Sequence, residues 1–151
     1  MEGPSADICE KGGRPMSDAT TVLFIDDDPQ YRDYYAQRLQ ASASHYDVVH
    51  AATGRAGLDI CARQPIDCVV LEIDLPDMSG FEVLRKLVPR TYCPEIAVIV
   101  LTRFPNKFLL DVAIRNGAQA AFQKVLRNGD ILEQAILKAI ARVQVSNRLV
   151  S

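Results

Sequence analysis

The chain has 151 residues, 48% of them hydrophobic, which is a size and composition typical of one domain built around one continuous core. Its formal net charge of −2 gives no overall attraction to nucleic-acid phosphates or to anionic lipid. Composition therefore argues against direct binding to nucleic acid or to membranes, and we expect protein partners.

The cysteines and the apolar runs indicate the cellular compartment. Cys9, Cys61, Cys68 and Cys93 form no CxxC pair, and two of them lie in apolar runs, where a thiol behaves as a small hydrophobic side chain. We expect buried, reduced cysteines rather than a disulfide or a zinc site. No apolar run approaches the roughly 20 residues that span a bilayer, and the N-terminal segment lacks a secretory apolar stretch. These features predict a cytoplasmic protein.

The first part of the chain predicts a tail, a strand and a helix. Residues 1–19 are rich in Gly, Pro, Ser and charge without any hydrophobic period, so a flexible tail is expected. The apolar, β-branched residues 20–25 predict the first strand. Asp28 can cap a helix and Pro29 suits its first turn, so a helix is expected from there to about residue 41.

The alternation of strand and helix continues through the rest of the chain. Further strands are predicted at 46–51, 67–73, 96–102 and 118–123, and further helices at 54–64, 80–88, 105–117 and 131–145. Asn128 or Asp130 is expected to cap the last helix, and residues 146–151 to form a tail, which gives a domain of residues 20–145. Continuous apolar strands are typical of a parallel sheet covered on both faces. The pattern thus predicts a doubly wound α/β fold.

Polar and charged side chains follow four of the predicted strands. In open α/β sheets, ligands bind beyond the carboxyl ends of the strands. Each of these side chains alone has an ordinary explanation, such as helix capping or a solvated lysine, but their shared position at one edge favours a common site. They are Asp26, Asp27 and Asp28 after the first strand, Glu72 and Asp74 after the third, Thr102 and Arg103 after the fourth, and Lys124 after the fifth.

This set of groups suits phosphoryl transfer to a carboxylate. Clustered carboxylates raise one another's pKa unless a cation lies between them, and several oxygen ligands suit Mg²⁺. A metal ion and a lysine would neutralise the phosphoryl oxygens, and a hydroxyl would donate a hydrogen bond to them. The strand ends therefore predict a Mg²⁺-dependent phosphoryl site.

Four motifs carry a resemblance to a known family. The segments VLFIDDDP, DCVVLEIDLPDMSGFEVL, VIVLT and NGAQAAFQK occur in order over about residues 20–145. On these segments the sequence resembles a response-regulator receiver domain of two-component signalling. The resemblance implies a flavodoxin-like fold, in which a five-stranded parallel sheet of strand order 2-1-3-4-5 is flanked by five helices.

The resemblance also implies roles for the residues at the strand ends. The metal ligands would be Asp26, Asp27, Glu72 and the backbone carbonyl of Asp74. The phosphoryl site would consist of Glu72 at the acceptor position, Thr102 as the switch hydroxyl and Lys124 as the phosphoryl-binding ammonium. The expected partner is a sensor histidine kinase or another signalling protein, and no enzymatic activity is expected. A monomer or a weak dimer through the fourth helix, fifth strand and fifth helix is implied.

The acceptor position departs from the family. The family has an aspartate four residues before the loop proline, and counting back from Pro76 gives Glu72. Glutamate reaches about 1.5 Å further and carries one charge, against roughly −2 for a phosphoryl group. Glu72 is therefore interpreted first as a fixed, partly activating charge, with two alternatives. It is either an inert carboxylate paired with Lys124 or a slow true acceptor.

Arg103 is a second departure, because the family usually has a small residue after the switch hydroxyl. Its guanidinium can fold over the mouth of the site and pair with Glu72 or Asp74, which would supply a countercharge from within the chain. The ordinary alternative is an exposed arginine at the start of a loop.

Three departures surround the fifth strand. Ala121 stands where the family has an aromatic switch residue, and Phe122 should face the opposite side of the sheet by strand alternation. Val125 replaces the proline that usually follows the lysine, so a trans peptide is expected there. Phe108, in the preceding helix, is a candidate anchor for a partner if it is exposed.

The sequence leaves three candidate functions. The favoured one is a receiver-like signalling protein that is barely phosphorylated and acts through protein contacts, either alone or as part of a longer hybrid kinase. The alternative is Mg²⁺-dependent phosphoryl chemistry at the acidic strand ends, either on the chain itself with Glu72 or Asp74 as the acceptor, or on a small phosphate ester. A flavodoxin-like cofactor binder is disfavoured, because the segment DDDPQ would repel a phosphate group.

Overall fold

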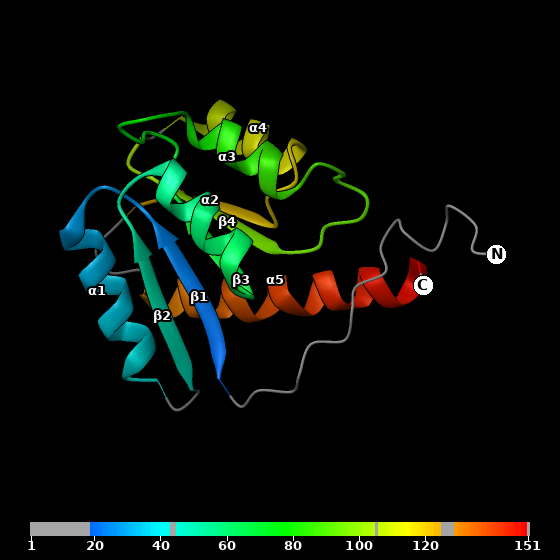
Figure 1. The fold of residues 1–151 in the computed structure, drawn as a ribbon, viewed down its shortest axis with the longest axis horizontal. Helices are drawn as coiled ribbons and strands as arrows, with labels where there is room; N and C mark the ends of the chain where they lie inside the picture. The colour runs from blue at the N-terminus through cyan, green and yellow to red at the C-terminus, as the bar shows by residue number, and fades with distance from the viewer. Residues whose placement is uncertain (1–18, 43–44, 105, 125–128, 151) are drawn as a thin grey trace.

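A computed structural model of the chain describes residues 19–42, 45–104, 106–124 and 129–150. It shows a five-stranded parallel sheet in the order β2-β1-β3-β4-β5, with helices on both faces (Figure 1). The predicted fold class and strand order are thus confirmed. The elements are β1 (Thr20–Ile25), α1 (Pro29–Gln40), β2 (Tyr46–Ala51), α2 (Gly54–Arg63), β3 (Cys68–Leu71), α3 (Gly80–Leu87), β4 (Ala97–Thr102), α4 (Lys107–Arg115), β5 (Ala120–Gln123) and α5 (Gly129–Val150).

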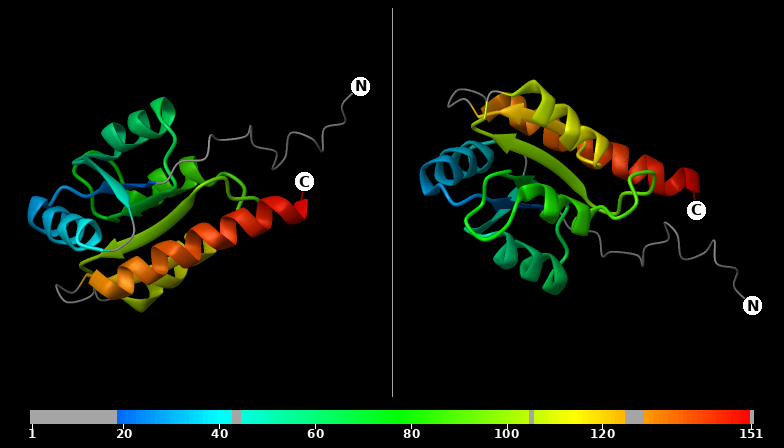
Figure 2. Two further views of the ribbon diagram at one scale, coloured as in Figure 1. Left: turned by 90° about the horizontal axis from the view of Figure 1, so that it is seen from below. Right: turned by 90° about the horizontal axis from the view of Figure 1, so that it is seen from above.

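The sheet separates two hydrophobic clusters, because successive strand residues point to opposite faces. Val22 and Phe24 of β1 pack with α1 and α5, whereas Leu23 and Ile25 pack with α3 and the neighbouring helices. Figure 2 shows α5 along one face of the sheet and α2 on the other. Phe122 belongs to the first cluster and Ala121 to the second, so the predicted opposition of these two residues is confirmed.

Side-chain caps fix where the helices begin. The carboxylate of Asp28 accepts a hydrogen bond from the Gln30 N–H at 3.0 Å and so caps α1, as predicted. Asn106 caps α4 in the same way, while Pro105 lies outside the described residues. Gly117 follows α4 with a φ of 108°, a left-handed conformation that suits the glycine predicted to end this helix.

The C-terminal end of the fold differs from the prediction. Helix α5 continues to Val150, so the tail expected at residues 146–151 is wrong for all but the last residue, which is not described. No Gly or Pro occurs in the sequence after Gly129, so nothing in this segment ends the helix. Asp130 lies in the first turn and forms an ion pair with Arg38 at 2.5 Å instead of capping. Asn128 and residues 1–18 of the tail predicted at 1–19 lie outside the described residues.

The cysteines follow the prediction only in part. Cys61 and Cys68 are free, and burial raises the pKa of the Cys61 thiol to about 11 and that of Cys68 still further. Cys93 is disulfide-bonded, so the expectation of reduced cysteines throughout is wrong. Separation along the sequence does not reveal which cysteines meet in space.

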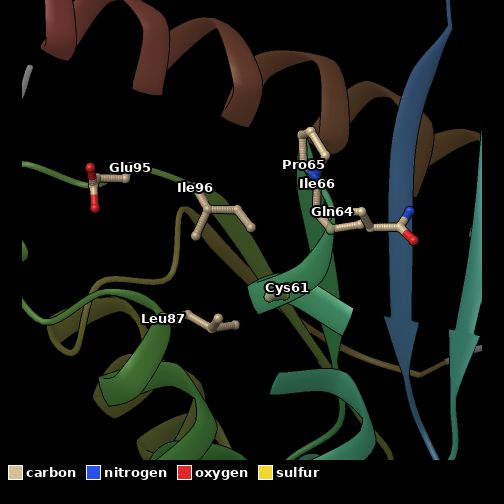
Figure 3. Close-up of a pocket in the computed structure, with 7 residues that line it drawn as sticks. All are labelled: Cys61, Gln64, Pro65, Ile66, Leu87, Glu95 and Ile96. Atoms are coloured by element: carbon tan, nitrogen blue, oxygen red, sulfur yellow. The ribbon is translucent and has the colours of Figure 1, made fainter. Parts of the chain in front are cut away.

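A pocket lies at the amino-terminal edge of the sheet, where β3 and β4 begin. Its volume is about 210 Å³, and its lining is mainly apolar with Gln64 and Glu95 as polar members (Figure 3). It lies at the end of the sheet opposite to the predicted phosphoryl site. None of the described helices is long and apolar enough to cross a membrane.

Gly80 allows α3 to start directly against the loop that carries Glu72. Its N–H donates to the Ile73 carbonyl at 2.7 Å. A Cβ atom at this position would lie 2.3 Å from the Glu72 carbonyl oxygen and 2.6 Å from the Ile73 Cα, which are backbone atoms that cannot rotate away. The absence of a side chain at Gly80 therefore sets the position of the Glu72 loop.

We expect Gly80→Ala to lower the free energy of unfolding by about 1–3 kcal/mol, because overpacking forces the backbone to shift. Urea unfolding monitored by circular dichroism measures the change. Gly54→Ala is the matched control, since a Cβ there would meet the side chains of Met78 and Val83 instead of backbone. A loss at Gly80 no larger than that at Gly54 would contradict this account of the loop.

Candidate functional site

The carboxyl ends of four strands bring the predicted residues together. Tyrosines apart, the buried polar or charged side chains of the described residues are Asp26, Glu72, Thr102 and Lys124, which are 5%, 2%, 0% and 6% exposed. They follow or end β1, β3, β4 and β5, in line with the rule that sites in open sheets lie at strand carboxyl ends. Buried polar groups need hydrogen-bond partners, which here come from the other side chains of the set and from the backbone.

Lys124 is the centre of this cluster. Its Nζ atom lies 2.5 Å from Asp26 Oδ2 and 2.9 Å from Glu72 Oε1. The same ammonium lies 4.5 Å from the centroid of the Tyr31 ring, in a cation–π arrangement. One ammonium thus bridges β1 and β3 from the end of β5, under an aromatic ring supplied by α1. The sequence analysis missed Tyr31, because no local motif shows which face of α1 meets the strand ends.

Glu72 is held from two sides. Its Oε1 atom accepts from Lys124, and its Oε2 atom accepts from the backbone N–H groups of Ile73 at 2.6 Å and Asp74 at 3.3 Å. Both carboxylate oxygens are therefore engaged, and the side chain is buried. The pairing of Glu72 with Lys124, which belonged to the alternative of an inert carboxylate, is present in the structure.

Burial and pairing act together on the titration of the cluster. Burial raises the pKa of the Asp26 carboxyl, and hydrogen bonds from Lys124 and from the Asp28 N–H offset only part of that effect. Burial lowers the pKa of Lys124, but the hydrogen bonds and charges of Asp26 and Glu72 outweigh it, so its pKa is raised above the ordinary value. Lys124 is therefore a firmly held cation at neutral pH.

A second cation lies at the mouth of the site. Arg103 Nη2 lies 3.2 Å from Asp74 Oδ2, and the two side chains are 55% and 50% exposed. The hydrogen bond from Arg103 to Asp74, and then the charges of Asp74, Glu72 and Asp27, raise the pKa of this arginine. The predicted pairing of Arg103 with Asp74 is confirmed. Beside it, Thr102 Oγ1 accepts a hydrogen bond from the Phe104 N–H at 3.3 Å.

The arrangement does not fit the Mg²⁺ site that the resemblance implied. Within residues 19–42, 45–104, 106–124 and 129–150, no three His, Cys, Asp or Glu side chains are placed to hold a metal ion. The carboxylates of Asp26 and Glu72 turn towards Lys124, and Asp27 is exposed. Mg²⁺ requires a near-octahedral set of oxygen ligands, and here two of the predicted ligands already bind an ammonium.

The remaining predicted residues are placed as follows. Ala121 is half-buried against the face of the sheet that α3 covers. Phe108 is 67% exposed on α4, as a partner anchor requires. Val125 lies outside the described residues, so the trans peptide expected there stays a prediction.

Comparison with known proteins identifies one family. The model of the response regulator receiver domain matches residues 22–136. A probable cyclic di-GMP phosphodiesterase of Vibrio cholerae is 39% identical over 57% of this chain and 19% of its own length. The transcriptional regulatory protein KdpE of Mycobacterium tuberculosis is also 39% identical, over 58% of this chain and 38% of its own. The chain thus spans well under two thirds of the length of these relatives.

Solved structures agree with the sequence comparison. The signal receiver domain of a putative LuxO repressor protein from Vibrio parahaemolyticus matches with a TM-score of 0.75 and 25% identity. The match covers 87% of this chain and 97% of that domain. The whole of the described α/β unit therefore corresponds to one domain of that kind.

We expect Lys124→Met to lower the free energy of unfolding by about 3–5 kcal/mol at neutral pH, because two buried carboxylates lose their shared cation. Since the pKa of Lys124 is raised on folding, its contribution is complete below its unfolded-state pKa and is lost as the pH rises through the folded-state value. The difference between the native protein and the variant should therefore shrink in the alkaline range above the ordinary lysine pKa.

Denaturant unfolding at a series of pH values measures this difference. Lys138→Met, the same change at an exposed position of α5, should have little effect. A Lys124→Met effect as small as that of Lys138→Met would show that the buried ion pairs do not hold the strand ends together.

Proposed function

The chain belongs to the response regulator receiver domain family, and from this premise we propose that it is an atypical receiver of phosphorelay signalling. In this proposal Glu72 supplies a fixed negative charge at the position where the family carries a transient phosphoryl group. The observation that carries the proposal is a carboxylate held at this position, since the Glu72 side chain is 2% exposed and its Oε1 lies 2.9 Å from Lys124 Nζ. An inert structural carboxylate would form the same pair, and the Glu72→Gln experiment below separates the two.

The two carboxylates already engage the Lys124 ammonium that a phosphoryl group would need. Lys124 already binds two carboxylates, Asp26 and Glu72, at 2.5 and 2.9 Å. A phosphoryl group entering the site would have to displace one of them from a buried position. The pair therefore supports a site in which carboxylates of the chain itself already neutralise the charge of Lys124.

The carboxylate of Glu72 is also poorly placed to attack a phosphoryl donor. Its Oε2 accepts two backbone N–H groups, and its Oε1 accepts from Lys124. Three of the roughly four lone-pair sites of this carboxylate are therefore occupied, and a reacting oxygen misplaced by about 1 Å costs on the order of 10²-fold in rate. The surroundings of Glu72 thus favour a standing charge over a nucleophile.

The proposed output is protein contact. Phe108 and Ile114 on α4 and Ile131 and Leu137 on α5 are large hydrophobic side chains with 45% to 67% of their surface exposed. Strand β5 is the edge of the sheet, with α4 packed on one face of the sheet and α5 on the other. Exposed apolar residues that lie together on a surface are typical of protein interaction sites. We propose that this face binds a sensor histidine kinase or another signalling protein, or forms a weak dimer, without enzymatic activity of its own.

The alternative is a working acceptor, and one observation favours it. Asp74 is exposed by half, so a phosphodonor can reach its carboxylate, whereas Glu72 is buried. In this alternative Asp74 or Glu72 would accept the phosphoryl group with the help of Mg²⁺. The same experiment separates the two functions.

We expect the full chain to gain no phosphoryl group when it is incubated with acetyl phosphate and MgCl₂ and its intact mass is measured. Glu72→Asp, which restores the shorter carboxylate at the acceptor position, is the matched variant and should gain one hydroxylamine-sensitive phosphoryl group. Stable labelling of the native chain that is lost in Glu72→Ala or in Asp74→Ala would establish the alternative function.

A fixed charge should also influence the output face. We expect Glu72→Gln, which removes the charge at nearly constant shape, to shift the amide resonances of Lys124, of residues 102–104 and of α4. Two-dimensional NMR of the native chain and the variant measures these shifts. Glu82→Gln, the same change on the surface of α3, is the control. Shifts confined to residues 71–75 would identify Glu72 as an inert structural carboxylate instead.

A further inference from the structure

The disulfide at Cys93 has one candidate partner in the sequence. The chain contains four cysteines, at positions 9, 61, 68 and 93. Cys61 and Cys68 are free, whereas Cys93 is disulfide-bonded and 2% exposed. Cys9, which lies outside the described residues, is therefore the cysteine left to pair with Cys93. This pairing would bring the segment of residues 1–18 to the loop between α3 and β4.

The loop that contains Cys93 also forms one wall of the pocket at the amino-terminal edge of the sheet. Glu95 and Ile96, which follow Cys93 by two and three residues, line this pocket together with Cys61 of α2 and Leu87 of α3 (Figure 3). The pocket volume is about 210 Å³, below the roughly 300–1,000 Å³ of most small-molecule sites. Its size therefore suits a side chain of a protein segment better than a whole ligand.

The chain enters the sheet beside this pocket. Strands β1 and β3 are parallel neighbours, and the Thr21 N–H donates a hydrogen bond to the Asp67 carboxylate at 2.8 Å. Asp67 directly follows Ile66, which lines the pocket. The segment that precedes β1 therefore joins the described fold at the edge where the pocket lies.

The segment is long enough to reach Cys93. Strands β1 and β4 are two positions apart in the sheet, a distance of about 10 Å. Cys93 precedes Ala97, the first residue of β4, by four residues, which span at most about 14 Å. Cys9 and Thr20 are eleven residues apart, and that length can span up to about 36–40 Å. The link between Cys9 and Cys93 therefore requires no change in the fold.

The residues next to Cys9 match the pocket in polarity and in charge. Ile8 is the large apolar residue nearest to Cys9 in the sequence, and the pocket lining is mainly apolar. Lys11 follows Cys9 by two residues, just as Glu95 follows Cys93 by two. A disulfide between these cysteines would thus bring an apolar side chain to an apolar lining and a cation close to a carboxylate.

We propose that the pocket is the docking site of the chain's own N-terminal segment, residues 1–18, with a disulfide between Cys9 and Cys93 as the anchor and Ile8 as the side chain that fills the pocket. Reduction by a dithiol adds two electrons and two protons to the two sulfur atoms, which gives two thiols and oxidises the dithiol to a disulfide. The segment is then released and the pocket is uncovered. This docking goes beyond the proposed function and does not depend on it.

Peptide mapping tests the linkage. The full chain is equilibrated with oxidised glutathione, its remaining thiols are alkylated with N-ethylmaleimide in denaturant, and the product is digested with trypsin. The four cysteines fall in separate tryptic peptides, residues 1–11, 56–63, 64–85 and 91–103. We expect mass spectrometry to find the first and the last of these peptides linked and the other two alkylated. Any other linkage of Cys93, or a free Cys93 thiol, would overturn the inference.

The docking itself is tested through Cys61, a free thiol in the pocket lining. In the folded, oxidised chain, N-ethylmaleimide should alkylate Cys61 on the order of tenfold faster in Cys9→Ser than in the native chain, since burial of one isoleucine side chain is worth at least that factor. Ile8→Ser keeps the disulfide and should accelerate the reaction likewise, whereas Ala6→Ser in the same segment should not. Native chain that has been reduced with dithiothreitol should react as fast as Cys9→Ser.

Cys68 is the internal control, because its thiol is 0% exposed and reacts only when the domain opens. Faster alkylation of Cys61 with an unchanged rate at Cys68 supports the docking. Equal Cys61 rates in the native chain, Cys9→Ser and Ile8→Ser would overturn it. An equal rise at Cys68 would overturn it too, because the substitutions would then act on the whole domain and not on the pocket. None of these outcomes depends on whether the chain can be phosphorylated.

Discussion

The ammonium of Lys124 between two buried carboxylates is the interaction on which the functional end of the sheet depends. It joins β5 to Asp26 after β1 and to Glu72 after β3, across strands that are not all neighbours. Buried ion pairs are often no more stabilising than apolar side chains of similar volume, although breaking one is costly. We therefore explain this cluster by the charged groups that it holds at the carboxyl ends of the strands, and not by stability alone.

Much of the fold was predictable because the local sequence signals for strands and helices agree with the way these elements pack in the sheet. The apolar strands are continuous and β-branched, and caps such as Asp28 stand directly before the helices. The spacing to Pro76 placed Glu72 at the acceptor position, and the parallel register then carried it to the same edge as Lys124. Strand order entered through the family resemblance, since alternation alone does not determine it.

Other features depend on side-chain geometry and could not be read from spacing. The sequence gives four acids in the right order for a metal site, but it does not show that two of them turn towards an ammonium. The ring of Tyr31 above Lys124 depends on a helix rotation that no local motif specifies. The disulfide at Cys93 depends on which cysteines meet in space, whereas the length of α5 follows from the lack of Gly and Pro after Gly129, a signal that the sequence does contain.

The contact between the Tyr31 ring and the Lys124 ammonium connects helix α1 directly to the charged cluster. Tyr31 also stacks with Tyr35, whose ring packs against Phe24 of β1, so the aromatic column runs from the ammonium into the core. A displacement of α1 by a bound protein would tilt the first ring of that column away from the cation. The lysine would then lose that aromatic contact, so the position of α1 bears directly on the charged cluster.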